Sequence, residues 1–113
     1  MQLVDKKITL TELKQLSERV FGNLVKAVID IKKGSMVVDA AMHADEEKFL
    51  LDRGSKQDDL WGINLYPEQK GDNFIEFDSV INLRPRQNNF SRGVDDKNLR
   101  KKIIDIVNKL VTT

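Results

Sequence analysis

Four stretches of this chain alternate between apolar and polar residues, and this period of two is the feature that most limits its fold. The stretches cover residues 24–31, 36–43, 60–66 and 74–84. Because successive side chains of a strand point to opposite faces, each stretch is typical of a strand with one buried side. Residues 32–35 have turn character, and pairing Ile31 with Met36 keeps both apolar sets on one face. The sequence therefore predicts four strands in a mainly antiparallel sheet.

Three further segments have the signals of helices. Thr9 and Glu12 have the spacing of a capping box, and Gly22 is suited to end the helix that follows. Asp45 is expected to cap a short helix before Gly54, with carboxylates in its first turn. Asp95 or Asp96 is expected to cap the last helix. Its apolar stripe has helical spacing and consists of Leu99, Ile103, Ile106, Val107 and Leu110.

The predicted order is helix, two strands, short helix, two strands, helix. Each strand has one apolar and one polar side, so helices packed on one face of the sheet would bury all the apolar sides together. The composition, 40% hydrophobic and 33% charged, is that of an ordinary globular chain, and 113 residues suit a single domain over residues 1–113. We therefore expect an α+β fold.

With helices on one face, the other face of the sheet is expected to be open and polar. Pairing Tyr66 with Phe74 would set Asn64 opposite Glu76 and Gly62 opposite Asp78, close enough for their side chains to cooperate. This face is either a solvated surface or a binding site. Its candidate binding residues are Asp39, His43, Asn64, Tyr66, Glu76, Asp78, Asn82 and Arg84.

The segment from Arg84 to Arg92 is a second candidate surface. It has no apolar period, is rich in donors and precedes a helix N-terminus, where anions are favoured. Phe90 could stack on a base, although Asp95 and Asp96 already lie at the positive end of that helix. The candidate anion-binding or partner-binding residues of this loop are Arg86, Asn88, Asn89, Ser91 and Arg92.

Catalytic and metal-binding signatures are sparse. The chain has no cysteine and a single histidine, His43, which excludes thiol catalysis, cysteine-ligated metals and His-rich centres. Asp39, Glu76 and Asp78 could still hold a hard cation through oxygen ligands, so a metal-assisted hydrolase remains an alternative. Because no pattern identifies a cofactor, none is predicted, and binding is expected rather than catalysis.

Charge along the chain is segregated although its sum is only +1. Residues 39–78 contain 11 acidic and 4 basic residues, whereas residues 84–113 contain 8 basic and 3 acidic residues. Opposed patches steer association, so a protein partner or self-association is expected; nucleic-acid binding through the arginine loop is an alternative that the low net charge weakens. Neither a membrane span nor a secretory signal is evident, and a cytoplasmic location is expected.

Several motifs resemble a family of small, uncharacterised bacterial proteins described only as a domain of unknown function. They cover residues 25–28, 43–47, 54–67, 75–79 and 81–85, and the likeness extends over nearly the whole chain. The longest motif, residues 54–67, is the most specific. The resemblance implies a bacterial-type cytoplasmic origin and brings no activity, cofactor or site.

Overall fold

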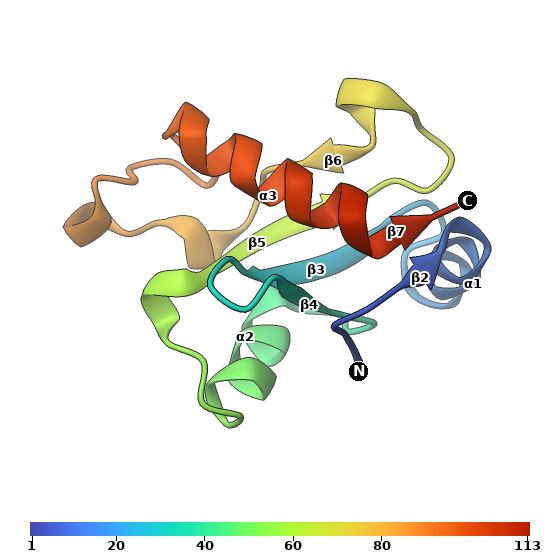
Figure 1. Ribbon diagram of the computed structural model, residues 1–113, viewed down its shortest axis with the longest axis horizontal. Helices are drawn as coiled ribbons and strands as arrows, with labels where there is room; N and C mark the ends of the chain where they lie inside the picture. Colours follow the sequence, from blue (N-terminus) through green and yellow to red (C-terminus); the bar gives the residue numbers. More distant parts are fainter.

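A computed structural model describes residues 1–113 and has three helices and a five-stranded sheet (Figure 1). The helices are α1 (Leu10–Val20), α2 (His43–Leu51) and α3 (Lys97–Leu110). The strands are β1 (Gln2–Val4), β2 (Ile8–Thr9), β3 (Val25–Asp30), β4 (Ser35–Val38), β5 (Leu60–Leu65), β6 (Ile75–Glu76) and β7 (Val111–Thr112). The main sheet is antiparallel in the order β1-β4-β3-β5-β6, which confirms the predicted α+β class. A separate parallel pair joins β2 to β7.

The sheet has five strands rather than the predicted four, because β1 adds to its edge. This strand has three residues and pairs with β4, placing Val4 beside Met36 and Leu3 beside Val37. So short a segment has no measurable period of two. Its place in the sheet depends on contact with β4, which local sequence does not encode.

The β3–β4 hairpin confirms the predicted faces but not the predicted partners. Met36 pairs with Ile29 rather than with Ile31, and Asp30 pairs with Ser35. The turn has the predicted length of four residues but begins one residue earlier, and the Asp30 side chain explains this, since its Oδ1 accepts the backbone N–H groups of Lys32 and Lys33, both at 3.0 Å. A shift of two residues leaves the side chains of β3 and β4 on their predicted faces. The strand predicted over residues 36–43 is shorter, however, and ends at Val38, because Asp39 has a left-handed φ of 71°.

Two predicted helix starts are confirmed and one is wrong. Thr9 and Glu12 form the capping box of α1, and Asp96 caps α3 by accepting the N–H groups of Asn98 and Leu99. The short helix, however, begins at His43 after Met42, which makes no side-chain capping bond. Asp45 therefore lies within the first turn, where its charge still complements the helix dipole.

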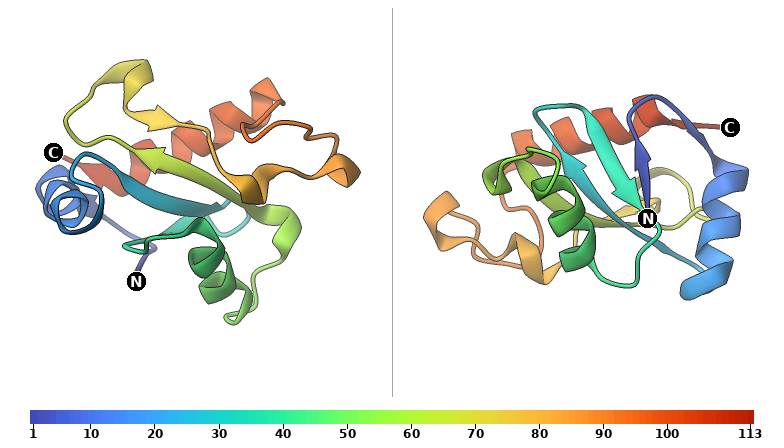
Figure 2. Two further views of the ribbon diagram at one scale, coloured as in Figure 1. Left: turned by 180° about the vertical axis from the view of Figure 1, so that it is seen from behind. Right: turned by 90° about the horizontal axis from the view of Figure 1, so that it is seen from below.

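The helices lie on both faces of the sheet, which corrects the prediction that they share one. The main cluster of 17 buried apolar residues includes the sheet-facing side chains of α1 and α3 together with Ala27, Ile29 and Ile63. A second cluster, on the other face, joins Leu50 of α2 to Val28, Val37 and Leu60. The views in Figure 2 show α3 and α2 on opposite sides of the sheet. The predicted open face is therefore covered by α2 over part of its area.

The predicted strand over residues 74–84 ends at Glu76, and the reason lies opposite Gly62. Gly62 donates its N–H to Asn82 Oδ1 at 2.8 Å, and its carbonyl accepts Asn82 Nδ2 at 2.9 Å. A side-chain amide thus replaces a strand partner. Residues 77–84 can then turn across the sheet, and Ser79 crosses directly over Gly62.

Replacing Gly62 with alanine is expected to destabilise the protein by about 2 kcal/mol, because the new methyl group would overpack this crossing. A Cβ at this position would lie 2.6 Å from Ser79 Cβ and 2.7 Å from Ser79 Oγ. Urea unfolding of the two proteins measures the loss. Adding Ser79→Gly should recover part of it; purely additive effects in the double variant would contradict the steric explanation.

Candidate functional site

The residues predicted to line an open polar face divide into buried and accessible groups. His43, Asn64 and Asn82 are buried, with exposures of 7%, 4% and 0%. Asp39, Tyr66, Asp78 and Arg84 are half-buried, and Glu76 is exposed. The accessible part is therefore a strip beside α2, at the end of β5 and β6, rather than a whole sheet face.

Glu76 is the centre of this strip. β5 and β6 place Asn64 opposite Glu76, which confirms the predicted pair. Asn64 Nδ2 and the Tyr66 hydroxyl both donate to Glu76 Oε1, at 2.8 and 3.0 Å. Burial and then this hydrogen bond raise the pKa of Tyr66, so the phenol stays protonated and acts as the donor. The two bonds fix the carboxylate and leave its Oε2 without a protein donor.

The other two carboxylates of the predicted set pair elsewhere. Asp78 accepts Arg92 Nε at 2.7 Å, and Asp39 forms an ion pair of 3.2 Å with Arg19 of α1. No three acidic or histidine side chains gather in a metal-binding arrangement. Asp39, Glu76 and Asp78 therefore bond to different partners and do not form one metal site.

His43 is the first residue of α2, and its side chain is buried against the sheet. Its Nε2 is 2.7 Å from the carbonyl oxygen of Ile63, and because a carbonyl only accepts, Nε2 carries the proton. Burial lowers the pKa of His43 below its ordinary value, outweighing that bond, so the neutral ring is favoured. In this position His43 anchors α2 to β5.

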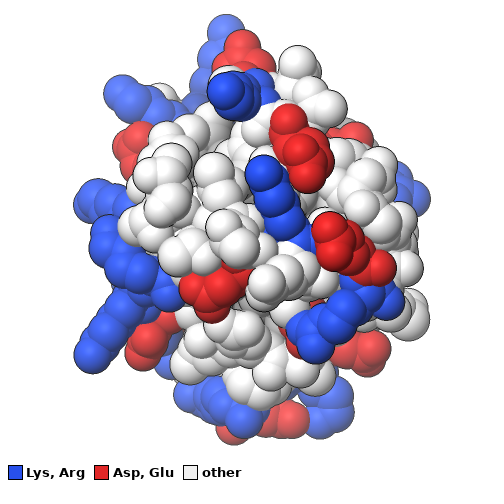
Figure 3. All heavy atoms as spheres, turned by 90° about the vertical axis from the view of Figure 1, so that its right-hand side faces the viewer, with Lys and Arg blue, Asp and Glu red and all other residues white.

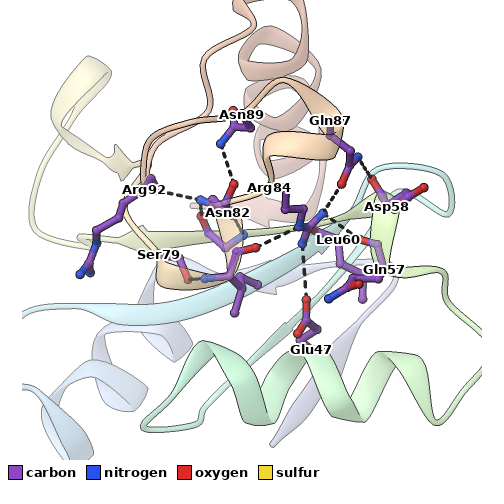
Figure 4. A network of polar contacts seen from close by, with 12 residues as sticks. Glu47, Gln57, Asp58, Leu60, Ser79, Asn82, Arg84, Gln87, Asn89 and Arg92 are labelled. Carbon is purple, nitrogen blue, oxygen red and sulfur yellow. Dashed lines mark hydrogen bonds and ion pairs between the residues drawn. The ribbon is translucent and has the colours of Figure 1, made fainter.

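Arg84 is half-buried and holds neighbouring segments of the chain together through its hydrogen bonds. All five of its N–H groups have protein acceptors, as Figure 4 shows in part. Four of these acceptors are the carbonyl oxygens of Ile81, Gln57 and Leu60 and the side chain of Gln87. The fifth is Glu47 Oε2, at 3.4 Å. The guanidinium also lies over Trp61, 4.6 Å from the ring centroid, and burial lowers its pKa.

Most of the predicted donors of the arginine loop are also used inside the loop. Asn89 Nδ2 donates to the carbonyls of Asn82, Ser91 and Gly93, and Asn89 Oδ1 accepts the N–H of Asp95. The Ser91 hydroxyl donates to Asp95. Asn88 adopts the left-handed conformation that closes the turn after residues 85–87.

The two other arginines of this loop differ in whether they have a partner. Arg92 is paired with Asp78, whereas Arg86 is exposed and makes no ion pair or side-chain hydrogen bond. The loop therefore presents one free guanidinium.

Glu46 is an unusual residue that sequence reasoning placed only in the polar first turn of a helix. It is 0% exposed, and neither of its carboxylate oxygens has a hydrogen-bond partner. Burial raises the pKa of Glu46 to about 10, and the positive charge of Lys26 and the nearby backbone N–H of Ala40 oppose this shift only in part. The spacing of residues could have indicated this burial, since Glu46 lies three residues after His43 and four before Leu50, on the buried face of α2.

A groove lies between α3 and residues 69–77 and is called here the α3 groove. It has a volume of about 650 Å³. Its apolar lining is Leu10, Phe74, Ile75, Phe77, Ile104 and Val111, and its polar lining is Gln69, Lys70, Gly71, Asp72, Arg100, Asn108, Thr112 and Thr113. None of these residues was a predicted site residue. Ile104 could have indicated the groove, because it is an apolar residue outside the buried stripe of α3.

A smaller polar pocket of about 450 Å³ lies against the Glu76 strip. Asn23, Tyr66, Asn73 and Glu76 line it, and it shares Gln69, Asp72 and Ile75 with the α3 groove. The loop 69–75 therefore borders both cavities.

Surface charge is more mixed than the counts along the chain. On the side of the molecule that carries α1 and the C-terminus, acidic and basic side chains are interspersed around uncharged areas (Figure 3). α3 itself is basic, with five Lys or Arg residues and one Asp. No helix has the length and apolar character needed to cross a membrane.

Comparison with known proteins gives a family but no activity. No curated protein and no solved structure matches the chain. Residues 2–110 match a family model described as "Protein of unknown function (DUF5674)", which confirms the resemblance to a domain of unknown function. The match covers nearly the whole sequence, and the chain belongs to this family.

Proposed function

We propose that this protein is a non-catalytic binding module and that the α3 groove is its principal site. The observation that carries the proposal is an apolar surface left uncovered: Ile104 is 36% exposed and lines one groove with Phe74, Ile75 and Phe77. Cavities of several hundred Å³ with an apolar lining and few polar groups are typical sites for small molecules. The ligand proposed is a small molecule with an apolar body, bound in the cytoplasm.

The placement of the titratable groups supports binding over catalysis. His43, Glu46 and Arg84, whose pKa values are shifted by burial, all lie outside the groove lining. The ionisable side chains that do line the groove are Lys70, Asp72 and Arg100. Lys70 and Asp72 are both exposed, and no hydrogen bond or ion pair links either of them to an adjacent base, as activation of a nucleophile requires.

The groove also has more support than the two surfaces expected from the sequence. The arginine loop uses the side chains of Arg84, Asn89 and Ser91 internally, and Asn64 and His43 are buried. A nucleic-acid site on this loop would depend mainly on Arg86. A metal site would need Asp39, Glu76 and Asp78 to leave their present partners.

Octan-1-ol, a neutral probe, is expected to shift the amide resonances of groove residues in ¹H–¹⁵N spectra. Ile104→Asn should weaken this binding about tenfold, because the probe loses an apolar contact surface worth about 1.4 kcal/mol. Val80→Asn is the matched control, since Val80 is an exposed aliphatic residue outside the groove. Equal weakening in both variants, or shifts scattered over the whole surface, would contradict the proposal.

A further inference from the structure

We infer that the ligand of the α3 groove is an amphipathic monoanion, a medium-length hydrocarbon with a carboxylate head, and that Arg100 binds this head. The inference rests on the proposed function and adds the chemical class of the ligand. Its basis is an arginine that lines a groove with six apolar residues and forms no ion pair.

The guanidinium of Arg100 is held in place by a hydrogen bond but forms no ion pair. It is half-buried, and its Nη1 donates to the carbonyl oxygen of Val94 at 2.6 Å, which holds the guanidinium in place. No carboxylate lies within ion-pair distance of it. Asp95 interacts with Arg100 only at longer range, and it is already the acceptor for the Phe90 N–H and the Ser91 hydroxyl. A half-buried guanidinium with no direct anionic contact can gain charge-assisted hydrogen bonds from a bound carboxylate.

Other arginines of the chain show the contrast. Three form ion pairs: Arg19 with Asp39, Arg84 with Glu47, and Arg92 with Asp78. Arg53 lies over the Phe49 ring, and Arg86 is exposed to solvent, where a lone charge is stable. Arg100 alone combines partial burial in a cavity with the lack of a partner.

The charges around the groove favour an anion over a cation. Its lining contains two basic side chains, Lys70 and Arg100, and one acidic side chain, Asp72. The exposed residues of α3 add four lysines, Lys97, Lys101, Lys102 and Lys109, against one aspartate, Asp105. A positive helix beside an apolar groove attracts anions at long range and holds them at the guanidinium. The apolar lining from Phe77 to Ile104 then accommodates the hydrocarbon.

The test compares three probes of equal chain length: octanoate, octan-1-ol and octylamine. Octanoate is expected to bind the wild-type protein about tenfold more tightly than octan-1-ol, and octylamine more weakly than either. Arg100→Met retains an apolar stem and should reduce octanoate binding to that of octan-1-ol. Arg100→Lys retains the charge and should keep part of the preference. Arg86→Met is the control, since it removes an exposed arginine outside the groove.

The outcomes separate the two proposals. If octanoate and octan-1-ol bind the wild-type protein equally, the inference about the head group is wrong and the groove remains a binding site. If octylamine binds most tightly, the groove prefers a cationic head group and the inference of an anion is wrong. If none of the three probes shifts groove resonances, the proposed function itself is wrong. Because the wild-type comparison decides each case, the test does not depend on the folding of any variant.

Discussion

Replacing Glu46 with glutamine is expected to stabilise the protein by about 3 kcal/mol at pH 7. The carboxyl of Glu46 is fully buried, has no hydrogen-bond partner and has its pKa raised from 4.5 to about 10. At neutral pH the unfolded chain carries an ionised Glu46, so folding has to protonate it. Glutamine has almost the same shape and is neutral in both states, so this unfavourable proton uptake disappears.

The pH dependence has a definite sign. Because the folded state binds one proton more than the unfolded state between pH 4.5 and about 10, the stability of the wild-type protein falls as pH rises through this window. The slope due to Glu46 is about −1.4 kcal/mol per pH unit. In Glu46→Gln this contribution is absent, so the two stability curves should converge toward pH 4.5 and separate above it.

Urea unfolding between pH 5 and pH 8 measures both effects. Asp45→Asn is the matched control, because Asp45 is an exposed carboxylate in the same helical turn. It should change stability by less than about 1 kcal/mol, through the helix dipole alone, and leave the slope unchanged. Parallel curves for the wild-type protein and Glu46→Gln would show that Glu46 is ionised in the folded state, and would refute the prediction.

Local features of the fold were predictable from sequence because their physical causes are local. The capping box at Thr9 and Glu12 and the cap at Asp96 each lie within four residues of the groups they bond. The faces of β3 and β4 were also correct, since the side-chain period of two survives a register shift of two residues. The Asn64–Glu76 pair followed from the same rule.

Long-range features were not predictable in this way. Nothing in the sequence of α2 indicates which face of the sheet it covers, because its buried side contains His43 and Glu46 as well as Leu50. Its position on the predicted open face covers Val28, Val37 and Leu60 and places His43 against the sheet, so the accessible part of that face is the strip around Glu76. The α3 groove depends on the approach of residues 69–77 to α3, two segments that no local pattern connects.

The segment from Phe77 to Asp95 explains why an alternating sequence did not form a strand. Its backbone is organised by three polar side chains, Asn82, Arg84 and Asn89, each of which makes several hydrogen bonds to backbone groups. Two of these residues were interpreted as candidate binding residues on an open face, and one as part of an anion loop. Side-chain donors that suggest a ligand site can instead bond to carbonyl groups of the chain itself. Asn82 and Asn89 are buried, which shows that they have this second, structural role.

Replacing Asn82 with alanine is expected to destabilise the protein by about 4 kcal/mol, because each buried polar group left without a partner costs about 1–3 kcal/mol. Asn82 is 0% exposed, and its amide bonds both backbone groups of Gly62 and the carbonyl oxygen of Arg92. Alanine removes all three bonds and leaves a small cavity beside Gly62.

Urea unfolding gives the size of the loss, and hydrogen exchange at the Gly62 amide locates it. That amide should exchange faster relative to global unfolding in the variant, since its acceptor is gone. Asn98→Ala on the exposed surface of α3 is the control and should be close to neutral. A loss of less than about 1 kcal/mol for Asn82→Ala would mean that Gly62 finds other partners. The amide bridge would then not be what turns residues 77–84 away from the sheet.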